Sequence, residues 1–190
     1  MPPLTIPKPI HFGSFLVTNQ VFHITPLSFA LVNLKPLLPG HVLVSPIRVV
    51  PRFNDLQPEE VHDLFQTVQR VSRMIERVFH ATSLNIAIQD GADAGQSVPH
   101  VHAHIIPRSR GDLDAKGGND AIYSMMESEH GDLSLSLKER DAGVVTGSTR
   151  ERSKFPAPDS DESRKPRSTE EMNKEASWLA SEMAYDIGRD

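Results

Sequence analysis

The spacing of apolar positions changes from one part of the chain to the next. Within residues 11–34, the runs FLV, VFHIT and LSFALVNL are rich in branched and aromatic residues and are separated by turn residues, so they predict consecutive strands. HVLVSP at 41–46 follows a Pro-Gly turn and predicts another strand. Because strands joined by tight turns usually pair with their neighbours, we expect an antiparallel arrangement.

The clearest helical pattern covers residues 58–80. Pro58, followed by two glutamates, suits the first turn of a helix. Apolar residues then recur at intervals of three and four, which places them on one helical face. They are Val61, Leu64, Phe65, Val68, Val71, Ile75, Val78 and Phe79.

A hairpin-like pair of strands is predicted next. LNIAIQDG at 84–91 leads into a turn, and HVHAHIIP at 100–107 is a second strand that Pro107 is expected to end. The polar loop ADAGQSVP joins the two, and its glycine is typical of such connections.

The character of the chain changes after Pro107. Residues 128–167 contain many charged and small polar residues and few large apolar ones, so they bury too little surface to offset the entropy cost of ordering. The run LSLSL at 133–137 alternates, but it is too short to predict a strand. We therefore expect a core at 1–127 and a disordered insertion at 128–167.

A C-terminal helix is predicted within residues 168–190. Ser168 and Glu171 match a capping box. One apolar stripe follows, formed by Met172, Ala176, Leu179, Ala180 and Met183. The stripe predicts that this helix docks on the core.

Composition limits the possible functions. The 190 residues suffice for one domain, and the net charge of −5 argues against a general nucleic-acid binder. The absence of cysteine excludes disulfides and thiol catalysis, and it favours a reducing compartment. The proline-rich start has no apolar run typical of a signal peptide or a membrane span. We expect a cytoplasmic protein with no membrane partner; the basic run SRKPR at 163–167 is either a solvated linker or a nuclear address.

Three of the nine histidines fall within five residues. His100, His102 and His104 alternate, and in a strand they would share one side while Val101 and Ala103 face the core. Three interpretations are open: an ordinary polar strand face, a metal site built from imidazoles, or a nucleophile that attacks phosphorus.

The loop before the histidines favours phosphate chemistry. Gly95 allows the backbone to approach a ligand closely, and Gln96 and Ser97 supply hydrogen-bond donors that suit phosphate oxygens. The nearby carboxylates, Asp90 and Asp93, lie in the preceding turn, so further strong metal ligands are scarce.

GQSVPHVHAHIIP resembles the signature of the histidine triad (HIT) family, His-x-His-x-His followed by apolar residues. That family binds nucleotides and cleaves or transfers at a nucleoside α-phosphate. The segments at 27–56 and 88–108 resemble its fragile histidine triad branch, the dinucleoside triphosphate hydrolases, as do NDAIYSMME and RSTEEMNKEA. The nucleoside phosphoramidase branch has Asn-x-Gly in place of QDG at 89–91. The resemblance implies an α+β HIT-like fold with an antiparallel sheet of about five strands, one long helix and a C-terminal helix, assembled as a homodimer.

The resemblance also implies roles for individual residues. His102 corresponds to the nucleophile, His104 to a phosphate ligand, and His100 to a residue that orients His102. His41, after the Pro-Gly turn, corresponds to a fourth histidine near the site, although a solvent-exposed residue at a strand start is as common. Asn33 corresponds to the residue that holds the ribose hydroxyls.

A second set of implied roles concerns the phosphates. Gln89 corresponds to the side chain that meets the scissile phosphate or the leaving group. Gln96, Ser97 and the backbone of Gly95 and Val98 would cradle phosphate.

Two aromatic residues complete the implied set. Tyr123 matches a tyrosine linked in the family to phosphorylation and substrate engagement, although an ordinary loop aromatic is the more common case. Phe15 stands where the family usually has a histidine after Phe-Gly, and it offers a ring for stacking on a purine.

The function that follows is hydrolysis of dinucleoside polyphosphates, best diadenosine triphosphate, to AMP and ADP through a nucleotidyl-histidine intermediate. A divalent cation, Mg²⁺ or Mn²⁺, is expected to arrive with the polyphosphate, without a tight metal site on the protein. Two alternatives remain: a nucleotide-binding signalling module whose occupied form is the signal, and a nucleoside phosphoramidase.

Overall fold

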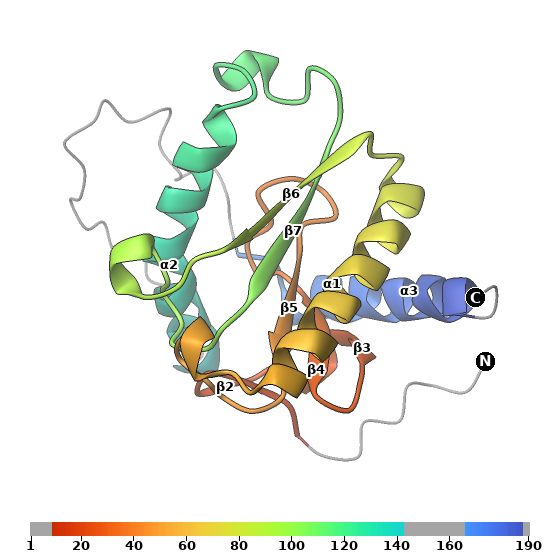
Figure 1. The fold of residues 1–190 in the computed structure, drawn as a ribbon. Helices are drawn as coiled ribbons and strands as arrows, with labels where there is room; N and C mark the ends of the chain where they lie inside the picture. Colours follow the sequence, from red (N-terminus) through yellow and green to blue (C-terminus); the bar gives the residue numbers. More distant parts are fainter. Residues whose placement is uncertain (1–8, 143–165, 188–190) are drawn as a thin grey trace.

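The computed structural model describes residues 9–142 and 166–187. Figure 1 shows a central sheet with helices packed around it. Its five antiparallel strands have the order β3-β4-β5-β7-β6, which confirms the predicted α+β class. Their bounds are Val21–Ile24 (β3), Ser28–Val32 (β4), Val42–Pro46 (β5), Ser83–Ile88 (β6) and Ala103–Arg108 (β7).

A separate small hairpin pairs His11–Phe12 (β1) with Phe15–Leu16 (β2). Single-turn 3₁₀ helices lie at Thr18–Gln20 (η1), Phe53–Asp55 (η2), Ala92–Ala94 (η3) and Asp114–Lys116 (η4).

Helix α1, Pro58–Phe79, confirms the long amphipathic helix. At its start the Gln57 amide donates to Glu60 Oε2 at 2.8 Å, and it ends at His80, whose φ of +52° is left-handed. Its apolar face is buried against the sheet, and Leu64, Val71 and Ile75 have no exposed surface.

Helix α2, Ala121–Ala142, covers the other face of the sheet. Because side chains alternate along β7, Ile105 joins the cluster that contains α1, whereas Ile106 packs with Ile122 and Met126 of α2. The structure differs here from the expectation of disorder over 128–167, since α2 continues to Ala142. Residues 143–165 lie outside the described residues.

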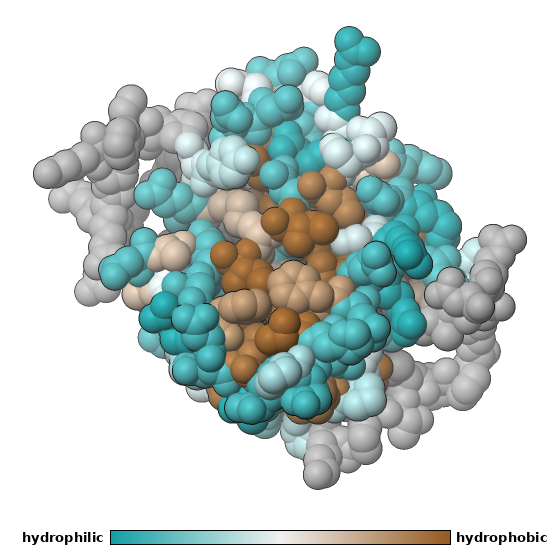
Figure 2. Space-filling model, viewed as in Figure 1, coloured by the Kyte–Doolittle hydropathy of each residue, from teal (hydrophilic) through white to brown (hydrophobic). Residues whose placement is uncertain are grey.

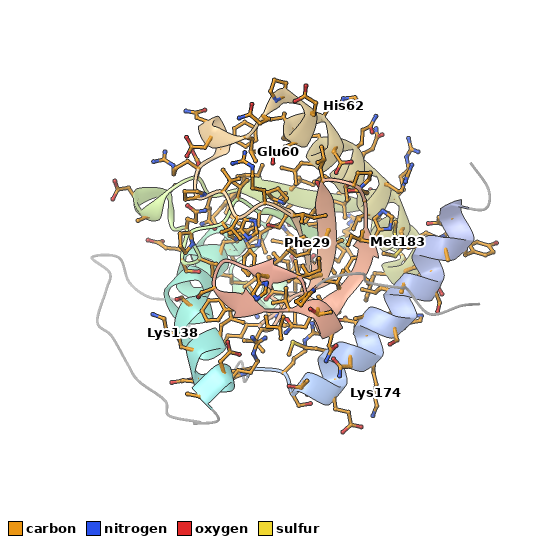
Figure 3. The ribbon with its side chains drawn as sticks, turned by 90° about the horizontal axis from the view of Figure 1, so that it is seen from below. Phe29, Glu60, His62, Lys138, Lys174 and Met183 are labelled. Carbon is orange, nitrogen blue, oxygen red and sulfur yellow. The ribbon has the colours of Figure 1, made fainter. Side chains whose placement is uncertain are left out.

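Helix α3, Thr169–Ile187, confirms the C-terminal helix and its capping box. The Ser168 amide donates to Glu171 Oε2 at 2.8 Å, and the Glu171 amide donates to Ser168 Oγ at 3.2 Å. Figure 3 places Met183 on the side of α3 that faces the strands and Lys174 on its outer side. Arg77 ties α3 to α1 through Glu182 at 2.7 Å and Asp186 at 2.9 Å. Across residues 9–142 and 166–187, no helix has the length and apolar character needed to cross a membrane.

The histidine segment departs from the predicted strand. β7 begins only at Ala103, so His100 and His102 precede it, and it continues past Pro107 to Arg108. The backbone bends before the strand because the His100 amide donates to Val98 O at 2.7 Å and the Val101 amide donates to Val50 O at 2.7 Å. Ser45 Oγ, which the sequence did not single out, donates to Val101 O at 2.7 Å and fixes this bend.

Candidate active site

The candidate site lies on the sheet face opposite α1. Strand register aligns Leu31 with Leu43, and Leu43 with His104, in one row across β4, β5 and β7. Asn33 and His41 lie just beyond the ends of their strands on this same face, because they are two residues from Leu31 and Leu43. The predicted triad and His41 are therefore brought together, and all four histidines are buried.

His100 is held at both ring nitrogens. The Gly13 amide donates to its Nδ1 at 3.0 Å, so the ring hydrogen is on Nε2, which donates to Pro46 O at 2.9 Å. Phe12 stacks on the ring with centroids 5.6 Å apart. Burial lowers the pKa of His100 to about 4. His100 is thus a neutral residue whose ring is fixed in place at both nitrogens.

The tautomer of His102 determines which ring nitrogen can react. Its Nδ1 lies 2.7 Å from the backbone oxygen of His100, and a carbonyl can only accept, so Nδ1 carries the hydrogen. The lone pair is consequently on Nε2. Burial lowers the pKa of His102 to about 4, which keeps the ring neutral at pH 7. A neutral imidazole with a fixed lone pair is the form required of a nucleophile.

A series of hydrogen bonds from Leu37 through His41 orients the ring of His104. The Leu37 amide donates to His41 Nδ1 at 3.1 Å, which places the hydrogen of neutral His41 on Nε2. That Nε2 donates to His104 Nδ1 at 2.9 Å, so neutral His104 carries its hydrogen on Nε2. The His102 and His104 ring centroids are 4.9 Å apart. The site therefore combines a lone pair on one ring with an N–H donor on the next.

Asn33 is placed beside this chain. Its Oδ1 accepts from the Lys35 amide at 2.9 Å, which orients the side-chain amide, and its Nδ2 lies 3.4 Å from His41 Nε2. Since both nitrogens carry hydrogen, the second distance is a contact and not a hydrogen bond.

An apolar pocket adjoins Asn33. A cavity of about 10 Å³ remains there, lined by Phe12, Val17, Gln20, Leu31, Val32, Asn33, Leu34, Leu43 and Leu137. Leu137 comes from α2 and is buried, and Arg140 Nη2 on the same helix donates to Leu16 O at 3.2 Å. Phe12 and Leu137 were both missed as site residues: Phe12 served only as part of the Phe-Gly landmark, and Leu137 lies in the predicted insertion.

Phe15 does not take the position expected of a base-stacking ring. It pairs with Phe12 across β1 and β2 and is buried in the main core, while Phe12 and Val17 line the pocket. The alternation along β1 and β2 gives the reason, since it turns Phe15 inward and leaves Leu16 exposed.

Two buried polar atoms near the loop before the histidines lack a hydrogen-bond partner among the described residues. Gly95 has a φ of +93°, which disfavours any side chain, and a Cβ there would lie 2.7 Å from Gln89 Nε2 and displace the Gln89 amide. Gln89 Oε1 and Ser97 Oγ are buried without a hydrogen-bond partner among the described residues. Such atoms are available to a ligand that supplies donors or acceptors.

The Gln96 side chain makes hydrogen bonds within the loop before the histidines. Its Oε1 accepts from the Gly91 amide at 2.9 Å, and its Nε2 donates to Pro51 O at 3.0 Å. Both polar groups thus stabilise the loop, and Nε2 carries a second hydrogen that the bond to Pro51 does not use, so the role of Gln96 as a phosphate ligand stays a prediction. Val98 is fully buried, and its backbone oxygen accepts from the His100 amide at 2.7 Å.

Tyr123 lies apart from the histidines. It is 64% exposed at the start of α2 and lines a polar cavity of about 300 Å³ with Asn85, Arg108 and Arg110. That cavity is at the Arg108 end of β7, whereas the triad is at the Ala103 end.

The metal-site interpretation gains no support from the geometry. Within residues 9–142 and 166–187, no three His, Asp or Glu side chains are grouped to hold an ion. Both ring nitrogens of His100 and of His41 already make hydrogen bonds within the protein.

Comparison with known proteins agrees with this geometry. The HIT domain model matches residues 16–111. Bis(5'-nucleosyl)-tetraphosphatase [asymmetrical] of Schizosaccharomyces pombe is 52% identical over 177 residues, which are 92% of this chain and 94% of that protein. Bis(5'-adenosyl)-triphosphatase of Dictyostelium discoideum is 47% identical over 71% of this chain and 89% of its own. The crystal structure of the C. elegans NitFhit protein is 33% identical with a TM-score of 0.64; the match covers 95% of this chain and 31% of that one. The chain therefore belongs to the HIT-domain family.

Proposed function

We propose that this protein hydrolyses dinucleoside polyphosphates, with diadenosine triphosphate as the best substrate, to AMP and ADP. The observation that supports this most directly is the hydrogen bond from His102 Nδ1 to His100 O, because it leaves a neutral Nε2 lone pair beside an N–H donor. The names of the two relatives agree with a polyphosphate substrate.

The reaction has two steps. In the first, His102 Nε2 attacks the α-phosphorus; a P–N bond forms, the P–O bond to the β-phosphate breaks, and nucleoside diphosphate leaves. In the second, water attacks the same phosphorus and gives up a proton to the solvent, the P–N bond breaks, and the lone pair returns to Nε2 as AMP departs. His104 Nε2–H stabilises the charge on the phosphoryl oxygens, and such a donor is worth about 3 kcal/mol.

The remaining groups bind the substrate. Asn33 holds the ribose, and the adjoining apolar pocket takes the base once the Leu137 side chain that lines it moves aside, because only about 10 Å³ is free there. Ser97 Oγ can donate to a phosphate oxygen, whereas Gln89 Oε1 can only accept, from a water attached to the phosphates. We expect a divalent cation to arrive with the polyphosphate and to neutralise the departing diphosphate.

Product analysis in ¹⁸O-labelled water tests this function. Diadenosine triphosphate should yield AMP and ADP, and diadenosine tetraphosphate should yield AMP and ATP, with the label only in AMP. The relatives bear both triphosphatase and tetraphosphatase names, so the ratio of kcat/KM for the two substrates decides the preference. Label in ADP or ATP would show attack at another phosphorus and contradict the proposal.

We propose a homodimer joined at β6. This strand ends the sheet, and Ile86 on it is 49% exposed, as Phe65 on α1 is 45% exposed. Figure 2, viewed as in Figure 1, shows apolar surface across the middle of the face on which β6 and α1 lie. Exposed apolar edge strands tend to pair. Sedimentation should give a dimer, and Ile86→Lys should shift it toward monomer; a wild-type monomer would contradict this assembly.

A further inference from the structure

Arg167 connects the C-terminal segment to the end of β4. Its Nε donates to the backbone oxygen of Asn33 at 3.0 Å, and its Nη2 donates to the same oxygen. Its own amide donates to Leu34 O at 3.0 Å. One residue thus holds two consecutive carbonyls that lie far from it in sequence.

Glu175 holds the other side of the guanidinium. Arg167 Nη1 donates to Glu175 Oε2, and both side chains are largely buried, at 19% and 18% exposure. A planar guanidinium fixed by a carboxylate and a carbonyl has little freedom to move, which a lysine ammonium would not reproduce. The basic run SRKPR therefore has at least one arginine that serves the interior of the fold.

Docking of α3 does not by itself account for this arrangement. The helix is already anchored by its buried stripe and by the pairs of Arg77 with Glu182 and Asp186. Arg167 instead reaches the peptide of Asn33, whose side chain contacts His41, which in turn donates to His104. A continuous series of contacts therefore leads from α3 to the histidine cluster.

We infer that Arg167, held by Glu175, is a positioning residue for the nucleoside subsite. By fixing the Asn33 peptide it fixes the direction of the Asn33 amide toward the ribose. The inference rests on the proposed function, in which Asn33 binds the ribose hydroxyls.

The test compares variants that loosen α3 in different places. Three variants remove or weaken the hydrogen bonds from Arg167 to the Asn33 carbonyl oxygen, which we call the clamp: Arg167→Ala, Arg167→Lys and Glu175→Gln. Arg77→Ala instead removes the ion pairs between α1 and α3. For each, KM, kcat, Tm and the Kd values of AMP and 2′,3′-dideoxy-AMP are measured. Loss of ribose discrimination is the readout that a purely structural role would not change.

Arg167→Ala should raise KM and the Kd of AMP about tenfold, the size expected from losing one or two hydrogen bonds, and should reduce the AMP preference over the dideoxy analogue. Arg167→Lys and Glu175→Gln should show the same change to a smaller degree. Arg77→Ala should lower Tm while KM and ribose discrimination stay within about twofold.

Three results distinguish failure of this inference from failure of the proposed function. If wild-type protein binds AMP but all three clamp variants keep its ribose discrimination, Arg167 is structural and the inference is wrong. The inference is also wrong if Arg77→Ala raises KM as much as Arg167→Ala does. If wild-type protein binds no nucleotide, the proposed function itself is contradicted.

Discussion

His102 Nδ1 lies 2.7 Å from the backbone oxygen of His100, two residues earlier in the chain. This contact decides which nitrogen of His102 is reactive, since the carbonyl accepts the hydrogen of Nδ1 and Nε2 keeps its lone pair. His100 makes the contact possible because Gly13 and Pro46 hold its ring from both sides.

Replacing His102 should separate binding from turnover. His102→Asn removes the lone pair but keeps a polar side chain, so we expect kcat to fall by at least about 10⁴-fold while the Kd of AMP changes little. Steady-state kinetics and calorimetry measure the two quantities. His80→Asn is the matched control, because His80 is an exposed residue with a left-handed φ that asparagine tolerates. Near-normal turnover by His102→Asn would contradict the mechanism.

The pH profile of kcat/KM should reflect the lowered pKa of His102. The ring is reactive only when neutral, so activity is lost as pH falls through its folded pKa of about 4, not through 6.5. Diadenosine triphosphate suits this measurement because its internal phosphates stay ionised across the range. An acidic limb centred near pH 6.5 would show that His102 titrates as an ordinary exposed histidine.

Buried histidines should also make stability depend on pH. The pKa values of His23, His100 and His102 are each lowered to about 4, mainly by burial. Below pH 6.5 the unfolded chain binds more protons than the folded one, so stability falls as pH drops from 6.5 toward 4, by on the order of 2 kcal/mol per histidine at pH 5. Urea unfolding at pH 5 and pH 7 measures the difference. His23→Gln should reduce it, and an unchanged difference in this variant would contradict the assignment to His23.

Truncating Leu137 should ease nucleotide entry. Leu137 fills the apolar pocket that we assign to the base, and only about 10 Å³ remains there. Leu137→Ala should therefore lower KM about two- to fivefold, with little change in kcat. Lys138→Ala is the control, because Lys138 points away from the sheet on the same helix (Figure 3). A higher KM in Leu137→Ala would mean that Leu137 contacts the bound base instead of competing with it.

The sequence predicted those parts of the fold in which local pattern and tertiary packing agree. α1 and α3 have strong apolar stripes and capping residues, so their bounds were close to those observed. The bend at His100 and His102 was not predictable, because it depends on Val50 and Ser45, which are distant in sequence. α2 was missed because its apolar residues make no sustained stripe and its packing on Ile106 is a tertiary effect.

The site was predicted in part for similar reasons. The triad spacing and the resemblance brought His41, His100, His102 and His104 together correctly. The sequence did not reveal that the Gln96 amide also bonds to Gly91 and Pro51, because Pro51 is distant from it in sequence. Arg167 gave only a charge signal, and its partner Asn33 is separated from it by most of the chain.

Trapping the covalent intermediate tests the central claim most directly. Enzyme mixed with excess diadenosine triphosphate is quenched in base within one turnover, since a phosphoramidate is more stable there than in acid, then digested and analysed by mass spectrometry. We predict an adenylyl group on the peptide that contains His102, formed and lost at rates that match turnover, and absent from His102→Asn. Full turnover with an unmodified His102 peptide, or with the adduct on another residue, would contradict the account.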